Sequence, residues 1–178
     1  MNIELKLCDE SDAHIIKNLW PLYVHDVSEF DAVTPNAHGL LLDDDKHKIL
    51  ADQCDTLRPW FNEPEALFPY LILVDGKPAG FNLVAARSRI DDSIDADFVV
   101  HEFFLLHAFR GGGVALEAVK QGFALHPGSW EVVTYPSHSR AIAFWMKATK
   151  GGGSDEVNGL EADHAFGRKV VFRFDTRS

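Results

Sequence analysis

The residues that most clearly suggest a chemical function are three consecutive glycines, Gly111, Gly112 and Gly113. They follow Arg110 and precede a helical pattern. A glycine inside a helix costs about 1 kcal/mol relative to alanine, so three at one helix start need a reason. The first N–H groups of a helix lack internal partners and lie at the positive end of its dipole. Glycine lets an anion approach them, and Arg110 would add a fork of donors. The pattern indicates an anion cradle, with a plain flexible turn as the alternative.

Better-known phosphate-binding patterns do not fit this stretch. No Gly-Lys-Ser/Thr closes the run as in a P-loop. Three adjacent glycines do not give G-x-G-x-x-G, and we expect no βαβ unit around them, which argues against a dinucleotide fold. A second glycine run, Gly151 to Gly153, is followed by no helical pattern and predicts a plain turn. What remains at the first run is Arg110-x-x-Gly113-x-Ala115 between an apolar strand and an amphipathic helix.

Hydrophobic periodicity predicts the elements that position this motif. Alternating apolar residues indicate strands, and apolar residues at helical spacing indicate helices. Ser11 or Asp12 can cap the first helix, Pro21 should bend or divide it, and Asp75-Gly76 is typical of a hairpin turn. The predicted strands are 3–8, 70–74, 79–86, 97–107, 130–135 and 169–174, and the helices are one after residue 12 and those at 46–57, 113–124 and 140–149. This order predicts a mixed α/β fold.

With its flanking segments, the glycine motif resembles the GCN5-related N-acetyltransferase (GNAT) superfamily. The acetyl-CoA signature of that family is Gln/Arg-x-x-Gly-x-Gly/Ala, after a hairpin seen here as YLILVDGKPAGFNLVAA and an apolar strand seen as VVHEFFLLHAF. The family motif Asn-x-x-Ala-x-x-Phe-Tyr is matched in spacing by His138-x-x-Ala141-x-x-Phe144-Trp145. The resemblance is strong from Tyr70 to Thr149, and LYVHDVSEF is similar to a stretch of an uncharacterised branch of the family.

The resemblance implies a fold and an activity. The expected fold is the acyl-CoA N-acyltransferase fold, with a central mixed, mostly antiparallel sheet flanked by helices, in a single N-acetyltransferase domain over residues 1–178. The expected activity is transfer of acetyl from acetyl-CoA to a primary amine of a small molecule or peptide, by direct attack in a ternary complex. Homodimers are frequent in the family. The alternative is a non-catalytic acyl-CoA-binding sensor or interaction module of the same fold.

By the same resemblance, three segments would bind the coenzyme. The glycine turn would hold the pyrophosphate, and the preceding strand would hold the pantetheine arm through its backbone and supply an oxyanion donor from a bulge. The motif at the predicted helix 140–149 would add the side chains of His138 and Phe144. The coenzyme-binding residues implied are Phe103, Phe104, Leu105, Arg110, Gly111, Gly112, Gly113, Val114, Ala115, His138 and Phe144.

Glu102 is the candidate general base. A carboxyl group buried in an apolar strand has a raised pKa, which suits removal of a proton from an ammonium. An outward-facing edge residue or an ion-pair partner is the alternative. His101, expected on the opposite face of the strand, competes weakly for the role. The family acid is a tyrosine, but Trp145 stands at that position, and an indole N–H is not a useful acid.

Two further sets of residues complete the predicted site. Tyr135, Ser137 or His138 could replace the missing acid, and nothing in the sequence chooses between them. For the acceptor, Tyr23, Asp26 and Glu29 are spaced by three residues and would share one side of a continuous helix. An acidic surface there would suit a cationic amine. The alternative is a solvated helix surface with the tyrosine packed into the core.

Composition and charge restrict the remaining possibilities. The chain has 178 residues, of which 46% are hydrophobic, and a formal charge of −10 from 17 Lys+Arg against 27 Asp+Glu, which disfavours nucleic acid and favours a cationic partner. Cys8, Cys54 and nine scattered histidines show no metal-ligand spacing, so we expect no metal. No apolar run approaches a membrane span, and MNIELKLCDE lacks the layout of a signal peptide, so a cytoplasmic protein is expected.

Overall fold

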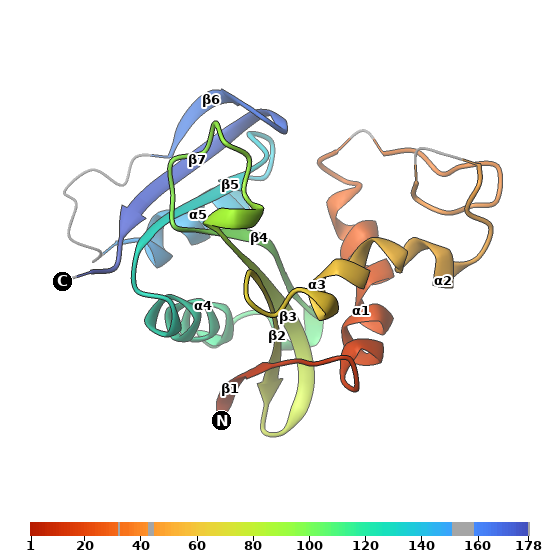
Figure 1. Cartoon of the computed structure of the whole chain (residues 1–178), viewed down its shortest axis with the longest axis horizontal. Coiled ribbons are helices and arrows are strands. Elements are labelled where there is room, and N and C mark those ends of the chain that lie inside the picture. The colour runs from red at the N-terminus through yellow and green to blue at the C-terminus, as the bar shows by residue number, and fades with distance from the viewer. Residues whose placement is uncertain (32, 43–44, 151–158, 178) are drawn as a thin grey trace.

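A computed structural model describes residues 1–31, 33–42, 45–150 and 159–177 of the chain (Figure 1). The second glycine run, Gly151 to Gly153, lies outside the described residues, so its role as a comparison stays a prediction. The strands are β1 (Ile3–Leu7), β2 (Leu67–Val74), β3 (Lys77–Ala86), β4 (Phe98–Leu105), β5 (Ser129–Thr134), β6 (Leu160–His164) and β7 (Gly167–Asp175). The helices are α1 (Ala13–Val27), α2 (Leu50–Gln53), α3 (Arg58–Asn62), α4 (Val114–Leu125) and α5 (Ser139–Ala148), with 3-10 turns at η1 (Asp55–Leu57), η2 (Arg87–Arg89) and η3 (His107–Phe109).

Within the described residues, the seven strands form one sheet in the order β1-β2-β3-β4-β5-β7-β6. Every neighbouring pair is antiparallel except β4 and β5, which are parallel. This confirms the mixed, mostly antiparallel α/β fold. Because β4, α4 and β5 form a parallel crossover, they are a βαβ unit around the glycines. The expectation that no such unit surrounds them is therefore wrong.

Helices α1 and α3 lie against one face of the sheet, and helices α4 and α5 lie against the other (Figure 1). On one face, Ile16 and Leu19 of α1 and Trp60 of α3 pack with Phe81 and Phe104 of the sheet. On the other face, α4 and α5 pack over a core that continues across β5 and β7 and includes Trp130, Val132, Val170 and Phe172. Because side chains alternate along a strand, Glu131 and Lys169 point to the α1 face. The part of the α1 face that β5 and β7 form therefore carries polar side chains.

The local predictions failed where polar side chains or a proline redirect the backbone. The helix predicted over 46–57 is wrong in its start and its continuity, because α2 begins only at residue 50 and the 3-10 turn η1 follows it. The Asp52 carboxylate accepts hydrogen bonds from the N–H groups of Lys48 and Ile49 at that start. Pro59, which has no N–H to offer, occupies the first turn of α3. In contrast, Pro21 lies inside α1 and does not divide it.

Three smaller expectations also change. Asp12 stands at the N-cap of α1 without a side-chain cap bond, because its carboxylate binds Lys6 Nζ at 2.9 Å. The strand predicted to reach residue 107 ends at Leu105, since the 3-10 turn η3 follows. The hairpin of β6 and β7 was not foreseen in its first strand, LEADH, which carries three charged or titratable residues. Across the part of the chain that the structure describes, no helix has the length and apolar character needed to cross a membrane.

Candidate active site

The site lies where the two parallel strands separate. β4 and β5 pair only between Phe98–Val100 and Trp130–Val132, and β4 then continues without β5 beside it. A bulge in β4 marks the separation, because Leu83 of β3 faces Glu102 while Val84 faces Val100, which leaves His101 as the extra residue. The cavity in this gap has a volume of about 1030 Å³.

The bulge turns two consecutive side chains toward the α1 face. The His101 ring packs edge-on against Trp60 of α3, with centroids 5.3 Å apart, and Glu102 accepts a hydrogen bond from the Tyr23 hydroxyl of α1. His101 Nδ1 lies 3.6 Å from Glu102 Oε1. The expectation that His101 and Glu102 occupy opposite faces is therefore wrong, because an inserted residue breaks the alternation of the strand.

Most of the predicted site residues line this one cavity. From the catalytic and coenzyme sets, the lining residues are Glu102, Phe103, Phe104, Leu105, Arg110, Gly111, Ala115, Tyr135, His138 and Phe144, and from the acceptor set they are Tyr23, Asp26 and Glu29. Gly112, Gly113 and Val114 do not line it. Val114, the first residue of α4, is buried in the core, whereas the two glycines are exposed at the N-terminus of that helix.

The three glycines all adopt positive φ angles, +93° at Gly111, +58° at Gly112 and +84° at Gly113. L side chains rarely adopt this conformation, which explains why the turn is made of glycine. Within the described part of the chain, the N–H groups of Gly112, Gly113 and Ala115 have no hydrogen-bond partner. The turn therefore presents free donors at the positive end of α4, as an anion cradle requires.

Arg110 is directed toward α1 rather than toward the glycines. Its guanidinium binds the carboxylate of Asp26, and its Nε donates to the Leu105 carbonyl at 2.8 Å. His107 Nε2 lies 3.0 Å from Arg110 Nη1, and the guanidinium carbon lies 5.9 Å from the Phe104 ring centroid. The coenzyme residue and one of the acceptor residues are thus joined to each other.

Glu102 has the properties expected of a base with a raised pKa. Burial raises the pKa of its carboxyl to about 8, and the positive charge of Lys169 opposes this rise. The side chain retains 24% exposure, toward the cavity. A group with this pKa is protonated below pH 8 and becomes a carboxylate above it, which is close to the range useful for proton transfer.

The two candidate acids are both engaged with the segment that follows α1. The Tyr135 hydroxyl donates to Asp31 Oδ2 at 2.7 Å, and burial together with this bond raises the pKa of the tyrosine far above its ordinary value. The His138 ring stacks on Phe30 with centroids 3.8 Å apart. Burial, and then the nearby Arg140, lowers the pKa of His138. The tyrosine is therefore a weak acid, and the histidine favours its neutral form.

Trp145 belongs to the core rather than to the reacting part of the cavity. It is 5% exposed and packs edge-on against Phe103 and Phe144, at centroid distances of 5.8 Å and 4.8 Å. Phe103 and Phe144 stack on each other at 5.8 Å. These rings form an apolar wall beside β4, where the pantetheine arm was expected.

The predicted acceptor residues do not form one acidic surface. Tyr23 packs against Trp20, Phe81 and Phe104 and binds Glu102, Asp26 pairs with Arg110, and Glu29 is exposed at the rim. Each therefore has a different environment. The core packing of Tyr23 agrees with the alternative interpretation of the first helix.

Sequence reasoning missed several polar residues of the same cavity. Lys169 of β7 is 8% exposed, and its ammonium lies 3.4 Å from the Tyr135 ring centroid. Glu131 is 1% exposed and accepts hydrogen bonds from His164 Nε2 at 2.9 Å and Arg173 Nε at 2.6 Å. The available signal was a charged residue on the alternate positions of a strand otherwise apolar, as in KVVFRF.

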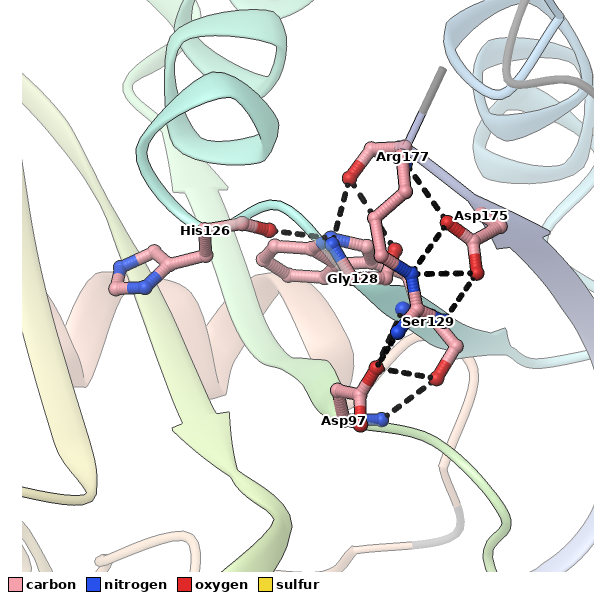
Figure 2. Close-up of polar contacts among 8 residues, drawn as sticks. Asp97, His126, Gly128, Ser129, Asp175 and Arg177 are labelled. Atoms are coloured by element: carbon pink, nitrogen blue, oxygen red, sulfur yellow. Dashed lines mark hydrogen bonds and ion pairs between the residues drawn. The ribbon is translucent and has the colours of Figure 1, made fainter.

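The opposite end of the strand pair is closed by side-chain hydrogen bonds (Figure 2). Asp97, just before β4, accepts hydrogen bonds from the N–H and hydroxyl of Ser129 at the start of β5, both at 2.9 Å. The Asp97 N–H donates back to Ser129 Oγ at 2.9 Å, and Arg177 lies 3.3 Å from the carboxylate. Arg177 also pairs with Asp175 at the end of β7. Side-chain contacts therefore join β4, β5 and β7 at the end of the strand pair that lies away from the cavity.

Comparison with solved structures places this fold. No protein-family model and no curated protein sequence matches the chain. The aminoglycoside acetyltransferase AAC(6')-Ib in complex with coenzyme A and kanamycin superposes with a TM-score of 0.67 at 19% identity, covering 98% of this chain and 95% of that chain. PaiA N-acetyltransferase from Thermoplasma acidophilum, in complex with coenzyme A, gives 0.64 at 8% identity, covering 98% and 99%. An acetyltransferase from Thermus thermophilus gives 0.63 at 14% identity, covering 98% and 97%. The chain therefore has the fold of the GNAT acetyltransferases.

Proposed function

We propose that this protein is an N-acetyltransferase of a single domain that transfers the acetyl group of acetyl-CoA to a primary amine with both substrates bound. The observation that carries the proposal is the glycine turn. Its three positive φ angles and its free N–H groups stand at the start of α4, where Gly111 and Ala115 line the cavity between the separating parallel strands. The shared fold and the coenzyme A named in two of the solved neighbours support it.

The residues present fit the coenzyme. The turn offers N–H donors for a pyrophosphate, and a Cβ at Gly111 or Gly113 would meet nothing within 4 Å, so the backbone is open to a ligand. Past Val100, β4 has no β5 partner, which leaves its edge free to bind an extended arm. Acetyl-CoA would supply a thioester carbonyl, which the amine attacks as the N–C bond forms and the C–S bond breaks.

In this proposal Glu102 removes the proton from the acceptor ammonium. Tyr23 donates a hydrogen bond to the carboxylate and orients it, while His101 lies beside the other oxygen. Neither Tyr135 nor His138 is well suited to protonate the thiolate, for the reasons given by their pKa shifts. Because a free thiol has a pKa near 8.5, the thiolate can leave without a dedicated acid.

The test is calorimetric titration of acetyl-CoA, with ATP and NAD as controls, followed by thiol release in the presence of amines. Selective binding of acetyl-CoA with amine-dependent thiol release is the expected result. Absence of acetyl-CoA binding would overturn the proposal. Binding without thiol release for any amine would instead favour the acyl-CoA-binding module, which the burial of Trp145 at the family's acid position supports.

A further inference from the structure

Lys169 presents an unpaired positive charge to the cavity. The residue is 8% exposed and lines the cavity from β7. Among the residues that the structure describes, none forms a hydrogen bond or ion pair with its ammonium, which lies over the face of the Tyr135 ring, 3.4 Å from the centroid. Buried charges in proteins are normally paired, because removal from water is costly. The missing partner is therefore expected to be an anion that enters the cavity.

The acidic groups nearest to Lys169 are committed elsewhere. Asp31 accepts the hydrogen bond of the Tyr135 hydroxyl, and Glu102 accepts that of Tyr23. Burial lowers the pKa of Lys169, and the charges of Asp31 and Glu102 oppose this lowering, but in the described part of the chain neither carboxylate forms an ion pair with the ammonium. The other titratable side chains lining this part of the cavity are His101, and Glu131 with its partner His164. Glu131 is occupied by His164 and Arg173, so it does not serve either.

We propose that Lys169 binds a carboxylate on the acceptor, so that the acceptors are amines that also carry a carboxylate, as amino acids do. This inference rests on the proposed acetyl transfer. Glu102 and Lys169 reach the same cavity from β4 and β7, on either side of β5. An acceptor can therefore place its ammonium toward Glu102 and its carboxylate toward Lys169 within this one cavity.

The charges around Lys169 select among anions and among amines. A phosphate dianion prefers several donors, and here a single ammonium faces it close to Asp31 and Glu102. A carboxylate monoanion matches that one charge. A polycationic acceptor would place a further positive charge beside the ammonium, which is unfavourable. The acceptor expected here therefore differs in charge from the kanamycin in the solved neighbour.

The test compares L-amino acids with their amides, which keep the amine and side chain and remove the negative charge. We expect kcat/KM for acetylation to be roughly 10- to 100-fold higher for the acids, as a charge-assisted hydrogen bond implies. Lys169→Met should abolish this preference and leave acetyl-CoA affinity unchanged. Lys169→Arg should retain part of the preference. Lys120→Met, at an exposed position of α4, is the matched control and should keep it in full.

A binding measurement separates this inference from the proposed activity. N-acetyl amino acids and their amides are titrated by calorimetry into the wild type and Lys169→Met, with coenzyme A present and absent. Binding of the acids alone, lost in the variant, is expected. Thermal unfolding should show no loss of stability in Lys169→Met, because an unpaired buried charge has been removed.

Three results would overturn the inference. Acids and amides could be bound and acetylated equally, Lys169→Met could lose acids and amides to the same extent, or no carboxylate could bind. Acetylation of amines without a preference for carboxylates would overturn it while the proposed function stands. Carboxylate binding that depends on Lys169, in a protein that neither binds acetyl-CoA nor releases thiol, would retain the anion site and remove the proposed transfer.

Discussion

The two ends of the β4–β5 pair treat their polar groups in opposite ways. At the closed end, Asp97, Ser129 and Arg177 satisfy one another, and the two strands pair from residue to residue (Figure 2). At the open end, the strands separate, the N–H groups of the glycine turn have no partners in the described chain, and Lys169 has no ion pair. One parallel pair therefore supplies stability at one end and binding capacity at the other. Variants at each end should separate these two properties.

The largest effect is expected from Gly113→Glu at the open end. A carboxylate at the start of α4 would repel a pyrophosphate and fill the cradle, so binding of acetyl-CoA should be abolished. Calorimetry measures this directly. Because residue 113 has a φ of +84°, the substitution also strains the backbone. Gly76→Glu, at a turn with a φ of +75° far from the cavity, controls for that strain. Unchanged affinity in Gly113→Glu would contradict the cradle.

Glu102→Gln should come next, with a loss of roughly 100- to 10,000-fold in turnover and little change in coenzyme affinity, as for removal of a general base. Turnover of the wild type should rise with pH with an apparent pKa of about 8, because only the carboxylate accepts a proton. The variant should lose this rise. Steady-state kinetics across a pH series gives both quantities, and an identical pH profile in the variant would remove Glu102 from the mechanism.

At the closed end, Asp97→Asn should weaken the charge-assisted hydrogen bonds of the carboxylate and leave coenzyme affinity unchanged. Because these bonds are partly exposed, the free energy of unfolding should fall by only about 1 kcal/mol. Hydrogen bonds from Ser129 lower the pKa of Asp97 in the folded state. Its contribution is thus present above the ordinary pKa of aspartate and is lost as pH falls through the lowered value. Urea unfolding at several pH values tests this. Asp95→Asn, at an exposed carboxylate nearby, is the control, and an equal loss there would contradict a specific role for the cluster.

The sequence could predict features that depend on local patterns, but not contacts between segments far apart in the chain. The glycine turn and the apolar strand before it are local patterns, so Gly113 and Phe104 were placed correctly at the start of α4 and in β4. Contacts between distant segments left no local signal. The pairing of Tyr23 with Glu102 joins residues 79 positions apart, and that of Tyr135 with Asp31 joins residues 104 apart.

The bulge at His101 was invisible for a related reason. Strand patterns assume strict alternation, whereas one inserted residue places two neighbours on the same face. Lys169 was interpreted as the start of a strand, and its place in the otherwise apolar run KVVFRF was the one local signal of a side chain that is 8% exposed. The fold and the coenzyme end of the site were therefore predictable, but the polar groups around Glu102 depend on tertiary packing.

The smallest effect should come from Asp26→Asn. This variant tests whether the ion pair between Asp26 and Arg110 competes with coenzyme binding at the open end. Asp26 binds the Arg110 guanidinium, so a coenzyme pyrophosphate must compete with that carboxylate. Because the pair is partly exposed, its release should raise acetyl-CoA affinity only about two- to fivefold. The affinity should also fall with added salt in both proteins, since charges at a partly exposed site are screened. Glu29→Gln removes the same charge from the exposed rim and serves as the control. An equal gain in both variants would attribute the change to net charge, and no gain in Asp26→Asn would mean that Arg110 does not contact the coenzyme.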